Sequence, residues 1–415
     1  MSKSLDVYLN GDLTGELHQN KQGQTSFTYS PEWLKDECAK PLSHSLPLRE
    51  ETYPARECQG FFAGVLPEEQ NREIIASILG ISARNDFALL EQIGGECAGA
   101  VSFLPQTSSY PQLEASYQAL SDDELATILR ELPTRPLMAG HKDIRLSLAG
   151  AQSKLAVHIK NGIISLPLGN SPSTHIIKPA IERFPDIVEN EVFCMSLATQ
   201  CGLPVAEVSQ ATVDGIDYFL TKRYDRHLSR ENKIERIHQE DFCQALALPP
   251  HLKYQNEGGP SIAQCFDLIR NVSTTPAPDI LTLLDTLVFN YLIGNNDAHG
   301  KNFSILCQKN NSDSSDYLTS LAPLYDLIST AHYPDLSHKM AMKIGTKYLP
   351  KELRAEHWQQ LWLESAFTPA QARKRTIQFT EKVLKALNRT PPQSTTQESI
   401  ASFISMRATA LKNMR

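Results

Sequence analysis

The stretch Ile293-Gly294-Asn295-Asn296-Asp297-Ala298-His299-Gly300-Lys301-Asn302-Phe303-Ser304 places a carboxylate, an imidazole, an ammonium and an amide close together. Gly294 and Gly300 favour a loop here, because glycine adopts backbone conformations that a Cβ disfavours. The preceding run 279–292 has apolar residues at helical spacing, and we expect Asp279 to cap this helix and Gly294 to end it. Residues 302–306 then alternate as a strand does. The polar cluster therefore lies between two apolar elements, where a functional site is expected.

Asp297 and Asn302 have the Asp-x-x-x-x-Asn spacing of a protein-kinase catalytic loop, in which the Asp accepts the substrate hydroxyl proton and the Asn holds Mg²⁺. Asn295-Asn296 replace the usual His-Arg before that Asp. Downstream, Asp326 lies in an apolar run, 324–327, that we expect to be strand-like, and it is a candidate second metal ligand. An isolated Asp and Asn can also cap loop turns, so the rest of the chain must decide.

Composition sets the limits within which these motifs are interpreted. The chain has 415 residues, enough for two or three domains, with 41% hydrophobic and 21% charged residues. Its net charge of −7 gives no global sign of nucleic-acid binding. The eight cysteines are scattered without a Cys-x-x-Cys pair, which argues for reduced thiols. No signal core or membrane-length apolar run is present, so we expect a cytoplasmic protein with no membrane partner.

A small-residue loop opens the segment 144–225. We expect strands over 144–148 and 154–159, joined by the tight turn Ala149-Gly150-Ala151-Gln152. Such a turn can lay backbone N–H groups over phosphates, as a kinase glycine-rich loop does, although a plain hairpin is the alternative. It is not a Walker A loop, because the Gly-Lys-Ser/Thr ending is absent.

A lysine and a glutamate follow this loop in the order that kinases use. Lys178 ends an apolar strand, where it either reaches a phosphate or extends to solvent. Glu191, which we favour over Glu189, lies on the next helix and suits the Lys–Glu pair of kinases. The strand up to Lys222 would offer backbone groups to adenine.

The order of these features predicts an α+β fold: a two-lobed protein-kinase-like structure with a β-rich N-lobe, a helical C-lobe and an N-terminal α+β accessory domain. We expect the accessory domain over 1–105, beginning with a hairpin at Asn10-Gly11. A linker at 105–109 and the N-lobe fill 106–225. The helical lobe with the catalytic loop fills 226–415.

The sequence resembles the HipA family of bacterial type II toxin–antitoxin serine/threonine kinases. In the N-terminal part, the resemblance rests on Val7-Tyr8-Leu9-Asn10-Gly11, Phe61-Phe62-x-x-x-Leu66-Pro67-Glu68, Arg72 and Asp86-Phe87-x-Leu89-Leu90. In the kinase part, it rests on 147–154, His175-Ile176-Ile177-Lys178-Pro179, Asn190-Glu191, Arg223-Tyr224-Asp225-Arg226, 238–242, 297–304 and Pro323-Leu324-Tyr325-Asp326. Two departures stand out. Ala298 and Gly300 have traded the places of the family's small residues, and Asp326 is not followed by the glycine of a typical kinase Asp-Phe-Gly, which the family also lacks.

The resemblance implies a role for each matching residue. The catalytic group would be Asp297, Asn302, Lys301 and His299, with Asn302 and Asp326 on Mg²⁺. The ATP-contacting group would be Leu148, Ala149, Gly150, Ala151, Gln152, Lys154, Lys178, Glu191, Lys222 and Tyr224. Ser147 stands where the family autophosphorylates, which would add about −2 charge beside the loop and switch the kinase off. Lys301 would neutralise the transferring phosphoryl group or be a solvated loop lysine, and we favour a structural role for His299.

The resemblance also implies partners. Such kinases pair with a helix-turn-helix antitoxin of the HipB type, and the complex binds operator DNA and represses its own operon. The protein substrate, by analogy, is an aminoacyl-tRNA synthetase.

Three other readings remain open. The chain could be a kinase-fold co-repressor without phosphotransfer activity, although the four key side chains Asp297, Asn302, Asp326 and Lys178 speak against that. A metal-dependent hydrolase built on Asp297-x-His299 would need further ligands nearby. Basic residues over 373–389, including Arg375, could contact nucleic acid, although such runs are usually solvated helix faces.

Arg223 and Asp225 are expected to form a local ion pair.

Overall fold

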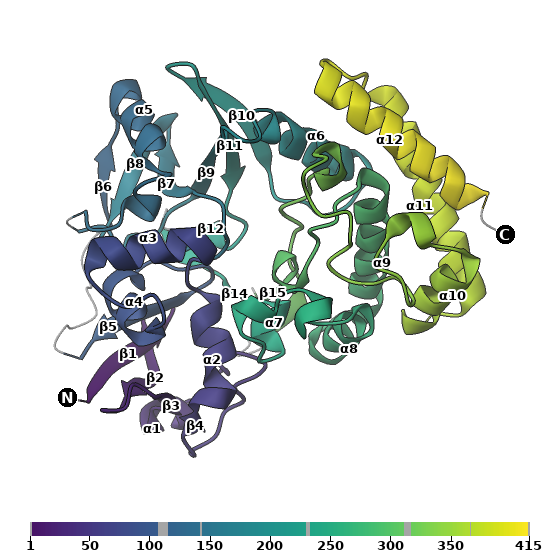
Figure 1. Ribbon diagram of the computed structural model, residues 1–415. Coiled ribbons are helices and arrows are strands. Elements are labelled where there is room, and N and C mark those ends of the chain that lie inside the picture. The colour runs from purple at the N-terminus through teal and green to yellow at the C-terminus, as the bar shows by residue number, and fades with distance from the viewer. Residues whose placement is uncertain are drawn as a thin grey trace. The chain divides into compact units, whose positions relative to one another are not determined.

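A computed structural model describes residues 2–106, 115–141, 143–229, 233–310, 317–365 and 367–413. The expected linker at 105–109 falls mostly outside these residues. The chain forms two compact units, the first from 1–179, 211–250 and 306–318, and the second from 180–210, 251–305 and 319–415 (Figure 1). Each unit is therefore assembled from segments that are distant in the sequence.

The two larger sheets of the described residues lie in the first unit. The five-stranded sheet has the order β4-β3-β2-β1-β5. Its strands are β1 (Lys3–Leu9), β2 (Asp12–Gln19), β3 (Thr25–Tyr29), β4 (Tyr53–Pro54) and β5 (Val101–Pro105). The six-stranded sheet has the order β10-β11-β9-β7-β8-β6. Its strands are β6 (Ser116–Ala119), β7 (Leu155–Lys160), β8 (Ile163–Leu168), β9 (His175–Pro179), β10 (Val208–Val213) and β11 (Ile216–Lys222).

The expected N-terminal hairpin is confirmed. β1 and β2 pair antiparallel and are joined at Asn10 and Gly11, whose φ values are +54° and +93°. Both residues are therefore left-handed, as the tight turn of a twisted hairpin requires, and an Asn-Gly pair adopts this conformation at low energetic cost.

Helices and apolar side chains join the two larger sheets of the first unit. Its helices are α1 (Pro31–Lys35), α2 (Ala55–Gly64), α3 (Glu69–Leu79), α4 (Asp86–Ile93), α5 (Asp122–Glu131) and α7 (Phe242–Ala245). α2 packs against β3, β4 and α7, and α4 packs against β5. One apolar core runs from Leu5 and Phe27 through Phe103 to Leu155 and Tyr218, and so extends across both sheets. The segment 1–105 thus shares its core with later strands.

The second unit is mainly helical and is built around α9 (Pro276–Ile293). Its other helices are α6 (Ile187–Gln200), α8 (Ile262–Val272), α10 (Ala355–Glu364), α11 (Pro369–Arg389) and α12 (Thr395–Lys412). α9 packs against α8, α11 and α12, and α6 packs against α11 and α12 (Figure 1). The expected helices after residue 240 are confirmed. Every residue of α9 from Leu283 to Ile293 is buried, so the predicted buried helix is confirmed.

Short strands complete the fold. β12 (Arg226–Leu228) pairs with β13 (Ile234–Arg236). A three-stranded sheet has the order β14-β15-β16, from His238–Asp241, Ser304–Lys309 and Tyr317–Leu321. The strand expected over 302–306 is thus confirmed from Ser304. The expected cap of α9 is wrong: the N-cap is Thr275, and Asp279 lies in the first turn, where it accepts hydrogen bonds from Ser273 Oγ (2.6 Å) and the Leu321 amide (2.9 Å).

Candidate active site

The end of α9 sets the direction of the candidate catalytic loop. Gly294 is the C-cap, with φ +75°, and its N–H donates to the carbonyls of Asn290 and Tyr291. A Cβ at this position would lie 2.6 Å from both Ala331 Cβ and Phe403 Cε1. Only glycine satisfies both the left-handed backbone and the close packing. The predicted helix end at Gly294 is therefore confirmed.

Asp297 and Asn302 lie together in this loop, as their spacing predicted. Asn302 Nδ2 donates to the Asp297 carbonyl at 3.0 Å, and the His299 amide donates to the same carbonyl at 2.7 Å. The Asp297 carboxylate accepts a hydrogen bond from the Tyr254 hydroxyl, with 2.6 Å between Oδ1 and the phenol oxygen. This bond fixes the rotation of the carboxylate before any substrate arrives. Tyr254 lies far upstream, and no spacing in the sequence pointed to it.

His299 and Lys301 are both buried, with 7% and 6% of their surface exposed. The His299 ring meets the Tyr254 ring edge-on at 5.3 Å between centroids, so the loop packs around the same tyrosine. The Lys301 carbonyl accepts a hydrogen bond from the Tyr325 hydroxyl at 2.8 Å. The solvated-lysine reading of Lys301 is therefore wrong.

Asp326 has an unusual backbone. Its φ is +58°, in the left-handed region that side chains with a Cβ rarely adopt, and such residues concentrate at functional sites. The strand expected around it is wrong: residues 325–329 are irregular, and Leu324 makes only an isolated bridge to Val205. The left-handed turn at Asp326 explains why the alternating pattern does not continue.

The oxygen atoms of Asn302 and Asp326 fit a hard divalent cation. Because Asn302 Nδ2 is committed to the Asp297 carbonyl, its amide oxygen points away from that bond and keeps its lone pairs for another partner. Amide and carboxylate oxygens are the ligands that Mg²⁺ prefers. Among the described residues, no group of three or more His, Cys, Asp or Glu side chains gathers in the way a hydrolase site on Asp297-x-His299 would need.

Helix α6 carries Glu191 and is held firmly in the second unit. Asn190, fully buried, accepts from the Ser329 amide at 2.9 Å and donates to the Ser329 carbonyl at 3.1 Å. Glu189 accepts from Ser394 Oγ at 2.6 Å and so joins α6 to the start of α12. Glu191 is 3% exposed. Because Glu189 is used by α12, Glu191 remains the better candidate for the kinase Lys–Glu pair.

The start of α6 makes a further polar contact with the second unit. His332 Nε2 lies 2.6 Å from Asp186 Oδ2, and Thr396 Oγ1 donates to the same oxygen at 3.1 Å. Burial alone would raise the pKa of Asp186, but the His332 and Thr396 hydrogen bonds outweigh it and hold that pKa below its usual value. The ionised carboxylate thus anchors α6 next to the segment that follows Asp326.

The expected hairpin over 144–159 is wrong. Residues 144–150 are extended but form only isolated bridges, including Glu96 with Leu146 and Pro67 with Gly150, while 155–160 pairs within the large sheet as β7. Side-chain bonds hold the small-residue turn: Asn71 Nδ2 donates to the Ala151 carbonyl at 2.7 Å, and Lys154 Nζ to the Ala149 carbonyl at 2.6 Å. The alternating residues that predicted two paired strands belong instead to a segment that forms single bridges with Glu96 and Pro67 of the N-terminal part.

Ser147 lies at the base of this segment and is completely buried. Its hydroxyl donates to the Val65 carbonyl at 2.8 Å, and its amide donates to the Glu96 carbonyl at 2.8 Å. The hydroxyl is therefore committed to the interior of the first unit in this conformation.

The remaining predicted nucleotide residues also lie in the first unit. Lys178 on β9 is 9% exposed and faces Phe219 on β11, with Nζ 5.1 Å from the ring centroid, so it does not extend to solvent. Lys222 ends β11. The Tyr224 hydroxyl donates to Gln239 Oε1 at 2.6 Å. The structure thus brings together Asp297, Asn302, His299 and Lys301 in one loop of the second unit, and places Lys178, Lys222 and Tyr224 in the first.

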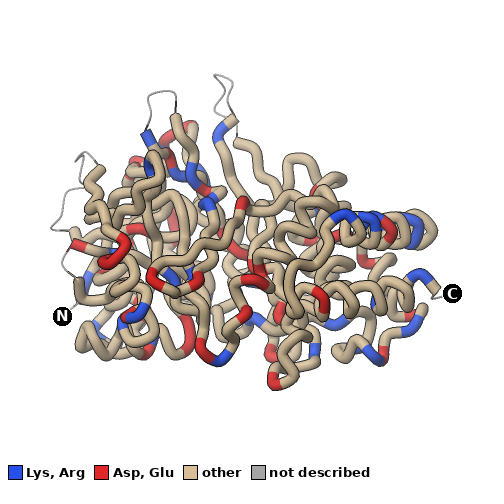
Figure 2. Tube along the Cα trace, turned by 90° about the horizontal axis from the view of Figure 1, so that it is seen from above, with Lys and Arg blue, Asp and Glu red and all other residues tan. Residues whose placement is uncertain are grey.

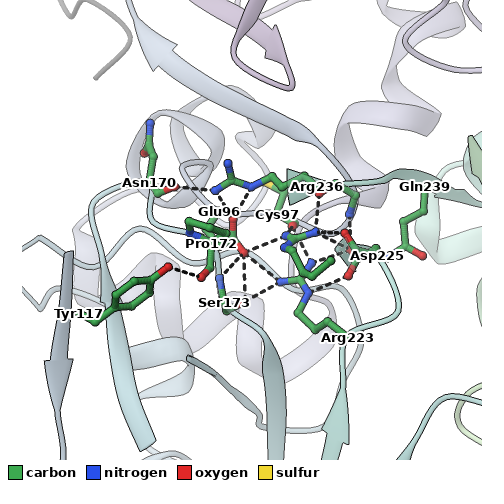
Figure 3. A network of polar contacts seen from close by, with 12 residues as sticks. Glu96, Cys97, Tyr117, Asn170, Pro172, Ser173, Arg223, Asp225, Arg236 and Gln239 are labelled. Atoms are coloured by element: carbon green, nitrogen blue, oxygen red, sulfur yellow. Dashed lines mark hydrogen bonds and ion pairs between the residues drawn. The ribbon is translucent and has the colours of Figure 1, made fainter. Parts of the chain in front are cut away.

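A buried ionic network in the first unit includes partners that the sequence did not identify (Figure 3). Arg223 pairs with Asp225 as expected, with Nη2 to Oδ2 at 2.7 Å. The carboxylate of Glu96, from the N-terminal segment, accepts hydrogen bonds from two arginines. Arg226 Nη2 lies 2.8 Å from Oε1, and Arg236 Nη2 lies 2.6 Å from Oε2. Burial alone would raise the pKa of Glu96, but the guanidiniums of Arg226, Arg236 and Arg223 outweigh it and hold that pKa well below its usual range.

Basic and acidic residues are interspersed along the chain (Figure 2). In the stretch considered for nucleic-acid contact, Arg375 donates to Asp285 with Nε to Oδ1 at 2.9 Å, and is therefore committed within the second unit. Across the part of the chain that the structure describes, no helix is both long and apolar enough to cross a bilayer.

Known proteins are similar to this chain over most of its length. Two family models match: HipA N-terminal domain over residues 5–104 and HipA-like C-terminal domain over 146–387. The inferred kinase Y4mE of Sinorhizobium fredii is 45% identical over 389 residues, covering 93% of this chain and 91% of that protein. The serine/threonine-protein kinase toxin HipA of Shewanella oneidensis is 28% identical over 365 residues, covering 85% and 81%.

A solved structure extends the similarity to three dimensions. The Shewanella oneidensis HipA, in complex with HipB and operator DNA, matches with a TM-score of 0.82 and 25% identity over 98% of this chain and 96% of that chain. This match confirms the expected α+β, kinase-like fold. The two family models together cover most of the sequence, from the N-terminal hairpin through the catalytic loop and most of α11. The chain therefore belongs to the HipA family and is a kinase.

Proposed function

We propose that this chain is an ATP- and Mg²⁺-dependent serine/threonine protein kinase that acts as the toxin of a type II toxin–antitoxin pair. The observation that carries the proposal is the arrangement around Asp297. Its carboxylate is oriented by Tyr254 at 2.6 Å, and its carbonyl holds the amide of Asn302. An oriented carboxylate beside an oxygen ligand for a metal is what phosphoryl transfer to a hydroxyl requires, because most of its catalysis is positioning and charge neutralisation.

Each residue has one task in this proposal. Asp297 orients the attacking hydroxyl and accepts its proton. Lys301 and Lys178 neutralise phosphate charge, and His299 keeps the loop packed on Tyr254. Asn302 and Asp326 would hold Mg²⁺, which when bound neutralises the charge of the phosphates.

Motif position assigns the nucleotide contacts of the first unit. Residues 148–152 and Lys154 contact phosphate, and the backbone near Lys222 and Tyr224 contacts adenine. Lys178 takes the role of the lysine in the kinase Lys–Glu pair, and Glu191 that of the glutamate.

Autophosphorylation at Ser147 is the proposed off-switch, and the burial of this residue supports it. The hydroxyl must leave the Val65 carbonyl to reach a γ-phosphate. Once phosphorylated, a group of about −2 charge cannot return to a fully buried position without a cationic partner. The modified segment therefore stays out of its native position, and the nucleotide loop is lost with it.

The proposed partners are a HipB-type antitoxin, operator DNA reached through that complex, and a cytoplasmic protein substrate of the translation machinery such as an aminoacyl-tRNA synthetase. The Shewanella HipA structure, which contains HipB and operator DNA, supports the first two. The substrate class rests on family resemblance.

Phosphoryl transfer is tested directly with purified protein, Mg²⁺ and labelled ATP. Asp297→Asn should abolish transfer, while Asp267→Asn, an exposed aspartate on α8, should not. Phosphate mapped to Ser147 in the parent alone supports a self-limiting kinase. If a parent that intact mass shows to be unphosphorylated binds ATP and transfers nothing, the chain is a co-repressor without phosphotransfer activity.

A further inference from the structure

We propose that Asn295 is a positioning residue of phosphotransfer, whose side-chain amide joins the catalytic loop at Asp297 to the proposed metal ligand Asp326. The inference rests on the proposed function. Asn295 is the first of the two asparagines that replace the usual His-Arg pair of kinase catalytic loops. The inference therefore gives a role to a residue at which this sequence departs from the kinase pattern.

The contacts of Asn295 reach both aspartates. Its Oδ1 accepts from the Asp297 amide at 3.1 Å. Its Nδ2 donates to the Asp326 carbonyl at 3.3 Å and to Asn290 Oδ1 at 3.1 Å. The residue is 5% exposed, so these bonds are made away from bulk water. Two oxygen acceptors meet Nδ2 and one N–H donor meets Oδ1, so the orientation of the amide is determined by its surroundings.

The backbone of Asp326 explains why such a contact is needed. Its φ of +58° is unfavourable for a residue with a Cβ, and a conformation of this kind persists only when its surroundings hold it. The hydrogen bond from Asn295 holds the Asp326 carbonyl and thereby the direction in which the carboxylate leaves the chain. The same amide holds the Asp297 backbone. One side chain thus fixes the direction of both aspartates.

Asn296 provides a matched control. It is the same residue type at the next position and is 6% exposed. Its side-chain Nδ2 donates to the backbone carbonyl of Ser337 at 3.2 Å. Its backbone N–H donates to Thr330 Oγ1 at 2.8 Å. None of these contacts involves Asp326. A general loss of loop packing should therefore affect both asparagines, whereas loss of positioning should affect only Asn295.

The test is Asn295→Ala, which removes both the donor to the Asp326 carbonyl and the acceptor of the Asp297 amide. We expect kcat about 100-fold below the parent, because small misplacements of reacting groups cost about that much. ATP binding should be unchanged, because the Asn295 side chain is not proposed to touch the nucleotide. Asn296→Ala removes a buried contact of the same kind that does not involve Asp326, and it should leave kcat near the parent value.

Autophosphorylation, ATP hydrolysis and ATP binding are measured for the parent, Asn295→Ala and Asn296→Ala, with a thermal melt of each protein. Asn295→Ala should remain folded and bind ATP as the parent does. If it does not fold, Asn295→Gln, which keeps the amide but moves it by one methylene, is tested for the same loss of kcat. With an active parent, a folded Asn295 variant whose kcat equals that of the parent or of Asn296→Ala overturns the inference alone. A parent without transfer overturns the proposed function and the inference with it.

Discussion

Replacing Glu96 by Gln tests whether the buried ionic network holds the first unit together. The substitution keeps the size of the side chain but removes the carboxylate that pairs with Arg223, Arg226 and Arg236. Arg223 and Arg226 keep the carboxylate of Asp225. The Glu96 side chain is 1% exposed, so water cannot compensate for the lost charge. Removing one partner of a buried ion pair typically costs about 3–5 kcal/mol. That is a large share of the roughly 5–15 kcal/mol that stabilises a domain.

Thermal unfolding of the parent and variant measures this loss. For a unit of this size, 1 kcal/mol moves the melting midpoint by about 2–4 °C, so we expect Glu96→Gln to melt about 6–20 °C lower. Amide hydrogen exchange on β5 and β9 assigns the loss to the first unit. The matched control is Glu91→Gln, which breaks the exposed pair with Lys3 in the same unit and should cost no more than about 1 kcal/mol.

The pH dependence of the same variant has a defined sign. The pKa of Glu96 is lower in the folded protein than its ordinary value, so its stabilising effect is complete above that ordinary value and is lost as the pH falls through the folded pKa. The difference between parent and Glu96→Gln should therefore narrow in acid. The reasoning is refuted if Glu96→Gln and Glu91→Gln melt within about 3 °C of each other at pH 7.

Three further predictions concern other parts of the chain. Tyr254→Phe should lower kcat about 10-fold and move the acid limb of the pH–rate profile to higher pH, because it removes the hydroxyl that donates to the Asp297 carboxylate at 2.6 Å. An acid limb at the same pH as in the parent contradicts this. Burial raises the pKa of Glu240 to about 7, so the contribution of this group to stability should fall by roughly 3 kcal/mol between pH 4.5 and 7, where the unfolded chain loses the proton that the folded protein keeps. Glu240→Gln should flatten that slope in urea titrations. Gly294→Ala adds a Cβ 2.6 Å from neighbouring side-chain atoms at φ +75°, and it should lower the free energy of unfolding by at least roughly 3 kcal/mol. Gly215→Ala, with φ +73° and open space around the new Cβ, should lower it by about 1–2 kcal/mol. Equal losses in the two variants would exclude the packing argument.

Much of the local structure followed from the sequence. Asn10-Gly11 predicted a hairpin, because few residue pairs adopt two left-handed conformations cheaply. The apolar spacing of 279–292 predicted a buried helix, and Gly294 predicted its end. These features depend on interactions within a few residues, so they can be read from adjacent residue types. The spacing of Asp297 and Asn302 likewise predicted that they would lie together.

Other features depended on partners that the spacing of residues does not identify. The alternation of 144–148 predicted a strand, yet its partners are Glu96 and Gly169 in isolated bridges rather than a neighbouring hairpin strand. The strand expected around Asp326 fails because that residue turns into the left-handed region. Alternation records which side chains are buried, but it does not record whether another backbone pairs alongside.

The sequence by itself determined the local elements, the order of the kinase motifs and the loop that carries Asp297. The tertiary structure alone decided which distant groups control that loop and hold the first unit: Tyr254 on the carboxylate, Asn295 between two aspartates, and Glu96 among the guanidiniums. Local conformations are set by near neighbours along the chain. A buried hydrogen bond or ion pair, however, depends on where two segments meet after the core has formed, and residue types alone do not state that position.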